Sequence, residues 1–85
     1  VLYRAPKATE WKEVTWDWAL ARIAENIKRT RDNTFLSKDK MGNIVNRTEG
    51  IACLGSAAMN NEECYLYSKM ARALGIVYLE HCARI

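Results

Sequence analysis

Apolar side chains recur with a helical period over residues 16–27, which makes this stretch the clearest element of the sequence. The apolar positions fall at i, i+3, i+4, i+7, i+8 and i+11 and form one stripe: Trp16, Ala19, Leu20, Ile23, Ala24 and Ile27. Thr15 is a suitable N-cap, and Asp17 places an acid in the first turn, where the helix dipole favours it. The basic residues 28–31 suit the other end of the dipole, with a phosphate site as the alternative. We expect a helix whose stripe, Trp16 included, faces a core.

The segments on either side of this helix indicate short strands. Leu2–Arg4 reads as an extended piece, and Trp11–Val14 alternates apolar and polar residues as an edge strand does. After the helix, the sequence Asp39–Asn43 is typical of a turn. We expect it to join two short strands, around residues 35–36 and 44–45.

The second half of the chain predicts a strand, a helix and a second strand. Gly50–Gly55 is apolar without alternation, as in a strand buried on both faces. Asn61 is a suitable N-cap for the next helix, and Gly75 a suitable stop. The apolar stripe of that helix consists of Leu66, Met70, Ala73 and Leu74. Ile76–Leu79 then reads as another strand, so the unit is a βαβ crossover with parallel strands. The predicted fold class is α/β, a piece of a Rossmann-like αβα domain with two main helices.

Length and composition narrow the possible functions. The 85 residues allow one small domain, and 49% hydrophobic with 27% charged residues is the composition of a globular protein. The net charge of +3 is spread among acids, which argues against a dedicated nucleic-acid binder. The cysteines Cys53, Cys64 and Cys82 form no CxxC pair and are accompanied by one histidine, so we expect small buried residues and no zinc site. No apolar run approaches the roughly 20 residues of a membrane span.

The topology places two segments at the carboxyl ends of the predicted parallel strands, where open α/β sheets bind ligands. One is the loop Gly55–Asn61, which enters a helix N-terminus and offers backbone N–H groups to an anion. The other is His81–Arg84, which leaves the second strand. We expect these segments to be neighbours. The candidate cofactor-binding residues are Gly55, Ser56, Asn61 and Arg84. An ordinary turn, a surface histidine and a structural ion pair remain the alternative interpretations.

Several stretches resemble the molybdopterin-dependent oxidoreductases, and most of all the large subunit of formate dehydrogenase. Those that carry the resemblance are Leu2–Pro6, Trp11–Leu20, Gly55–Ser56, Asn61–Glu62, Tyr65, Lys69, Arg72–Ala73 and Cys82–Ile85. The residues Asp32, Phe35, Gly42 and Val45–Arg47 resemble the respiratory and periplasmic branch, which includes tungsten enzymes. The resemblance covers nearly all of the chain and a small part of such a subunit.

The resemblance implies an enzyme that oxidises formate to carbon dioxide. Its cofactor would be molybdenum or tungsten held by two pyranopterin guanine dinucleotides, with an iron–sulfur cluster, and all metal and cluster ligands would lie outside this chain. In selenium-containing members, the motif similar to Cys82–Ile85 is followed by selenocysteine, histidine and glycine. Residues 1–85 would then be a partial domain, inactive alone, in contact with the rest of the subunit and with an iron–sulfur partner subunit, in the periplasm.

Three other functions remain open from the sequence. The first is another molybdopterin oxidoreductase, of the nitrate reductase type. The second is a small basic interaction module whose aromatic residues form an interface. The third is a nucleic-acid binder that stacks bases on Trp11, Trp16 and Trp18, which steep salt dependence of binding would identify.

Overall fold

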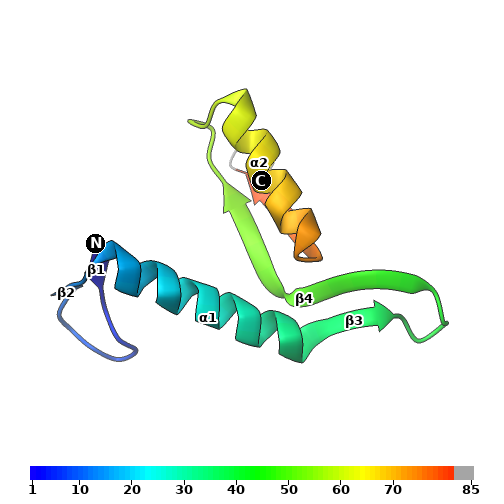
Figure 1. The fold of residues 1–85 in the computed structure, drawn as a ribbon, viewed down its shortest axis with the longest axis horizontal. Helices are drawn as coiled ribbons and strands as arrows, with labels where there is room; N and C mark the ends of the chain where they lie inside the picture. Colours follow the sequence, from blue (N-terminus) through cyan, green and yellow to red (C-terminus); the bar gives the residue numbers. More distant parts are fainter. Residues whose placement is uncertain (82–85) are drawn as a thin grey trace.

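The computed structural model describes residues 1–81, which form two helices and two small sheets (Figure 1). The chain begins with strands β1 (Leu2–Tyr3) and β2 (Lys12–Glu13), which pair antiparallel. Helix α1 (Trp16–Thr34) follows directly. The mixed α/β class and the two helices that the sequence predicts are therefore confirmed.

Helix α1 begins where the sequence predicts. The Thr15 hydroxyl accepts a 3.2 Å hydrogen bond from the N–H of Trp18, so Thr15 is the N-cap. The apolar stripe, however, is not buried among the described residues. Ala19 is the one buried residue of α1, whereas Trp16 is 69% exposed. The prediction that Trp16 lies in a core is wrong for this chain, because no described element covers that face of the helix.

Strand β3 (Phe35–Lys38) pairs antiparallel with the first part of β4 (Ile44–Gly55), which confirms the predicted hairpin. The Asp39 carboxylate closes the turn by accepting hydrogen bonds from the backbone N–H groups of Met41 and Asn43, both at 2.9 Å. The hydrogen bond from the Asn43 backbone lowers the pKa of Asp39 below its ordinary value. The two strands predicted around 44–45 and at 50–55 are one strand of 12 residues.

The second half of the chain is the predicted βαβ unit. Helix α2 (Asn61–Ala73) connects β4 to β5 (Ile76–His81), and the two strands run parallel. Gly75 follows the helix with a φ of +85°, the left-handed conformation that favours glycine after a helix. The predicted N-cap is wrong by one residue. Asn60 caps α2, and its side chain and that of Glu63 form a reciprocal capping box.

Little of the described chain is buried. The buried hydrophobic residues are Ala19, Ala71 and Ile76, with Thr48 as the buried polar residue. The predicted burial of 50–55 on both faces is wrong, because exposure alternates along the strand and Leu54 is 71% exposed. Cys64 is exposed as well, against the prediction of buried cysteines, and Cys53 is half-buried.

Among residues 1–81, no helix combines the length and the apolar character that crossing a membrane requires.

Candidate functional site

The carboxyl ends of β4 and β5 lie side by side. Gly55 at the end of β4 is paired in register with His81 at the end of β5. Gly55 continues into the loop 56–60, and His81 precedes residues 82–85, which lie outside the described part of the chain. The prediction that the two segments are neighbours is therefore confirmed as far as His81.

A cavity of about 870 Å³ extends from this edge, between α2 and β5, as far as Ile76 at the start of β5. Gly55 and Ser56 line it from the loop, and His81 lines it from β5. Helix α2 contributes a row of polar side chains at i, i+4 and i+8, which share one helix face: Cys64, Ser68 and Arg72. The sequence prediction missed this row, although its spacing on a predicted helix was the signal for it. The volume is within the range of small-molecule sites.

Ser56 lies at the edge of the cavity. Its hydroxyl oxygen accepts a 3.0 Å hydrogen bond from the backbone N–H of Ala58, which holds the loop in a tight turn. A serine hydroxyl can both accept and donate, so a ligand oxygen or ring nitrogen is a suitable partner for it.

The N-terminus of α2 is less suited to an anion than its position suggests. The N–H of Glu63 already donates to the Asn60 side chain at 2.8 Å, and the Glu63 carboxylate accepts from the N–H of Asn60 at 3.1 Å. Glu62 and Glu63 also place two carboxylates in the first turn. These carboxylates repel an anionic phosphate, so the favourable electrostatics at the cavity come from Arg72 on the last turn of the helix.

Helix α2 is tied to β4 below the cavity. The Tyr67 hydroxyl donates a long 3.4 Å hydrogen bond to the backbone carbonyl of Leu54. Hydrogen bonding with the Cys53 side chain raises the pKa of Tyr67 above its ordinary value, so its hydroxyl remains protonated at neutral pH. The helix face that carries Cys64 and Ser68 is thereby held against the strand whose end forms the cavity edge.

The donor set fits part of a pterin dinucleotide. Two serine hydroxyls, a guanidinium and the backbone of the loop 56–60 surround the cavity, and hydroxyl, amide and guanidinium groups are the usual partners of phosphate oxygens and heterocycles. Within residues 1–81, no three His, Cys, Asp or Glu side chains are placed to hold a metal ion.

The structure brings together two of the four candidate residues. Gly55 and Ser56 line the cavity. Asn61 is the first residue of α2, is exposed, and is not among the lining residues. Arg84 lies outside the described residues. Cofactor contact by each of the four stays a prediction.

Comparison with known proteins shows which class of protein the chain matches. No protein-family model matches it. Curated relatives do match over nearly the whole chain, and they include large subunits of formate dehydrogenases. The chain spans only about 8% of the length of these relatives.

Three relatives illustrate the match. The formate dehydrogenase subunit alpha of Megalodesulfovibrio gigas is 54% identical over 84 residues, which is 99% of this chain. The formate dehydrogenase 2 subunit alpha (cytochrome c-553) of Nitratidesulfovibrio vulgaris is 42% identical over 84 residues. The formate dehydrogenase-O major subunit of Escherichia coli is 36% identical over 83 residues, or 98% of the chain. This chain therefore matches one segment of a formate dehydrogenase large subunit.

Proposed function

We propose that residues 1–85 are a segment of a formate dehydrogenase large subunit, which oxidises formate to carbon dioxide. The observation that carries the proposal is the 54% identity over 99% of the chain with a formate dehydrogenase alpha subunit. A match of nearly the whole chain at this level leaves little room for the alternatives of a basic interaction module or a nucleic-acid binder.

In this proposal, the segment positions the cofactor and performs no chemistry itself. The metal, molybdenum or tungsten bound by two pyranopterin guanine dinucleotides, supplies the redox chemistry, and an iron–sulfur cluster carries the electrons away. Gly55 and Ser56 would contact the pterin or its phosphates from the edge of the β4–β5 pair, and Arg72 would contact them from the end of the cavity near the start of β5. Arg84, three residues beyond His81, would add positive charge near the same anionic group.

Because Cys82–Ile85 resembles the motif before selenocysteine, the metal-binding residue of the whole subunit would directly follow this segment. In that arrangement, β5 would aim the metal ligand and α2 would support it from behind. The partners would be the rest of the same subunit, an iron–sulfur electron-transfer subunit and formate. The periplasmic location rests on the family branch that residues 32–47 resemble.

Formate-dependent reduction of a viologen dye by the full-length subunit tests the proposal. We expect turnover by the full-length subunit loaded with metal and none by the purified 85-residue chain, because the proposed metal and cluster ligands lie outside the chain. A metal-loaded full-length subunit that does not reduce the dye with formate, but oxidises reduced viologen with nitrate, would contradict it. Activity of the 85-residue chain alone would contradict the scaffold role.

A further inference from the structure

The strand that leads to the candidate site is sharply bent, and the bend lies against the end of α1. Figure 1 shows β4 changing direction between the part that pairs with β3 and the part that pairs with β5. Thr48 belongs to both parts, since it is paired with Phe35 of β3 and with Ile76 of β5. The next pair joins Ala52 to Tyr78, so β4 advances four residues while β5 advances two. The two additional residues of β4 form a bulge, and bulges bend a strand.

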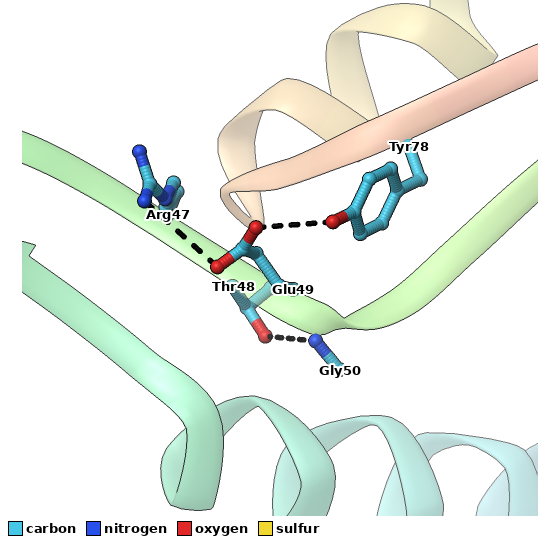
Figure 2. A network of polar contacts seen from close by, with 5 residues as sticks. All are labelled: Arg47, Thr48, Glu49, Gly50 and Tyr78. Atoms are coloured by element: carbon cyan, nitrogen blue, oxygen red, sulfur yellow. Dashed lines mark hydrogen bonds and ion pairs between the residues drawn. The ribbon is translucent and has the colours of Figure 1, made fainter.

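A directed chain of hydrogen bonds fixes this bend to α1. The N–H of Gly50 donates to the Thr48 hydroxyl at 3.2 Å (Figure 2). The Thr34 hydroxyl donates to the backbone carbonyl of Thr30 at 2.7 Å, because a carbonyl can only accept. The remaining bond, between the hydroxyls of Thr34 and Thr48, is then donated by Thr48. Each hydroxyl gives one hydrogen bond and receives one, and Thr48 is completely buried.

The close approach of α1 also explains the glycine at the bend. A Cβ atom on Gly50 would lie 2.7 Å from Oγ1 and 2.9 Å from Cγ2 of Thr34, and 3.0 Å from Cγ2 of Thr30. Real Cβ atoms do not approach other heavy atoms this closely, so any other residue would push β4 away from the helix. On the other side of the bend, the Glu49 carboxylate accepts a 3.0 Å hydrogen bond from the Tyr78 hydroxyl of β5 and lies 3.8 Å from the Arg47 guanidinium (Figure 2).

The bend acts on the candidate site through the length of the strand. Five residues of β4 separate Gly50 from Gly55, which corresponds to roughly 17 Å at the usual strand rise. A change of about 10° in the bend would therefore displace the cavity edge by about 3 Å, and β5 would move with it because the strands are paired up to His81. Displacements of about 1 Å at a reacting centre can reduce a rate about a hundredfold.

We infer that Gly50, Thr34 and Thr48 are positioning residues that set the direction of β4 and β5 and so place the cofactor-binding edge. The inference rests on the proposed function, since it assigns these residues to the site that would hold the cofactor. None of them is among the residues that line the cavity, although Ile76, which is paired with Thr48, is.

The test uses the full-length, metal-loaded subunit with the substitution Gly50→Ala. We expect kcat with formate to fall about tenfold or more while KM changes about twofold or less. The electron paramagnetic resonance signal of the metal should shift, with iron–sulfur signals of normal intensity. Gly42→Ala, at a glycine with nothing within 4 Å of its added Cβ, is the matched control and should leave both unchanged.

Normal kcat and a normal metal signal in Gly50→Ala would overturn the inference. If Gly50→Ala does not accumulate, Thr48→Val decides, because valine keeps the shape and removes the hydroxyl. A shifted metal signal with lower kcat then supports the inference, and an unchanged signal overturns it. Failure of the proposed function is seen separately, as a wild-type subunit that carries metal and does not turn over formate.

Discussion

The Nε of Arg31 donates a 2.9 Å hydrogen bond to the backbone carbonyl of Leu74, 43 residues further along the chain. The same guanidinium lies over the ring of Phe35, 4.4 Å from its centre. Leu74 is the C-cap of α2, where backbone carbonyls lack helical partners. One side chain therefore joins the ends of both helices, and α1 positions the βαβ unit at this point as well as at the bend of β4.

Replacing Arg31 with lysine should loosen the end of α2. Lysine keeps the charge but loses the directional Nε–H and the planar stacking on Phe35. A charge-assisted hydrogen bond of this kind is worth about 1–2 kcal/mol, so local opening should increase about 5- to 30-fold. Hydrogen–deuterium exchange of a peptide covering residues 70–76 in the full-length subunit measures this. Arg29→Lys is the control, since the Arg29 side chain bonds only Asn26 of its own helix among the described residues; equal exchange in both variants would refute the role of Arg31.

Gly75→Ala should destabilise the subunit more than Gly42→Ala. Both glycines have positive φ, +85° and +84°, so alanine is strained at both by about 1–2 kcal/mol. At Gly75 the added Cβ would also meet Asn46 O at 3.0 Å, Phe35 Cε2 at 3.2 Å and Arg47 Cα at 3.3 Å, whereas Gly42 is open. The difference between the thermal midpoints of the two variants measures the contribution of packing at Gly75. A Gly42 variant as unstable as the Gly75 variant would show that packing around Gly75 is unimportant.

The elements within each half of the chain follow from local sequence, but their mutual arrangement does not. The stripe beginning at Trp16 and the order strand, helix, strand after Gly50 predict α1, α2 and the parallel pair. The N-cap at Asn60 could also have been predicted, because Asn60 and Glu63 have the spacing of a capping box. The continuity of β4 through its bend could not be predicted from local sequence. It depends on the contact between Gly50 and Thr34, which are far apart in sequence.

Burial was the least predictable property, for a physical reason. A helical stripe shows which face is apolar and not whether anything covers it. In this chain Leu20 and Ile23 of that stripe remain 57% and 53% exposed. For the candidate site, the loop Gly55–Ser56 was predicted from topology. The spacing of Cys64, Ser68 and Arg72 puts them on one face of α2, but only the packing of α2 on β5 shows that this face lines the cavity.

The exposed apolar stripe predicts that the 85-residue chain alone lacks a cooperative unfolding transition. Among residues 1–81 the buried hydrophobic residues are few and mostly small, so the hydrophobic gain is insufficient to offset the entropy of folding. We expect a broad thermal transition and strong binding of the dye ANS, in contrast to the full-length subunit, where the rest of the polypeptide would cover the stripe. A sharp melt together with weak ANS binding would instead favour an independent interaction module.

Cys64 should report whether the cofactor occupies the cavity. This thiol is exposed and lines the cavity beside Ser68. In the subunit purified without cofactor, iodoacetamide should alkylate Cys64 readily, and loading with the cofactor should slow alkylation about tenfold or more by covering the thiol. Mass spectrometry of the peptide containing residues 61–69 measures this, with the half-buried Cys53 as an internal comparison. Equal rates with and without cofactor would place the cofactor elsewhere.

Ser56→Ala should weaken retention of the cofactor without unfolding the subunit. The variant would lose the proposed hydrogen bond to the cofactor and the turn contact to Ala58, together worth about 1–2 kcal/mol. The amount of guanine nucleotide that remains bound per subunit after dialysis, measured by denaturing the protein, should therefore fall clearly below the wild-type value. Ser37→Ala, at an exposed position on β3, is the matched control. Retention equal to that of the control would remove Ser56 from the binding site.

We propose that this segment leads into the metal-binding residue of a formate dehydrogenase. Sequencing the nucleotides that follow the codon for Ile85 is the decisive measurement. We expect a UGA codon, followed at once by codons for histidine and glycine and by an open reading frame. Any sense codon in place of UGA, or a UGA without those two codons behind it, would contradict the selenocysteine assignment.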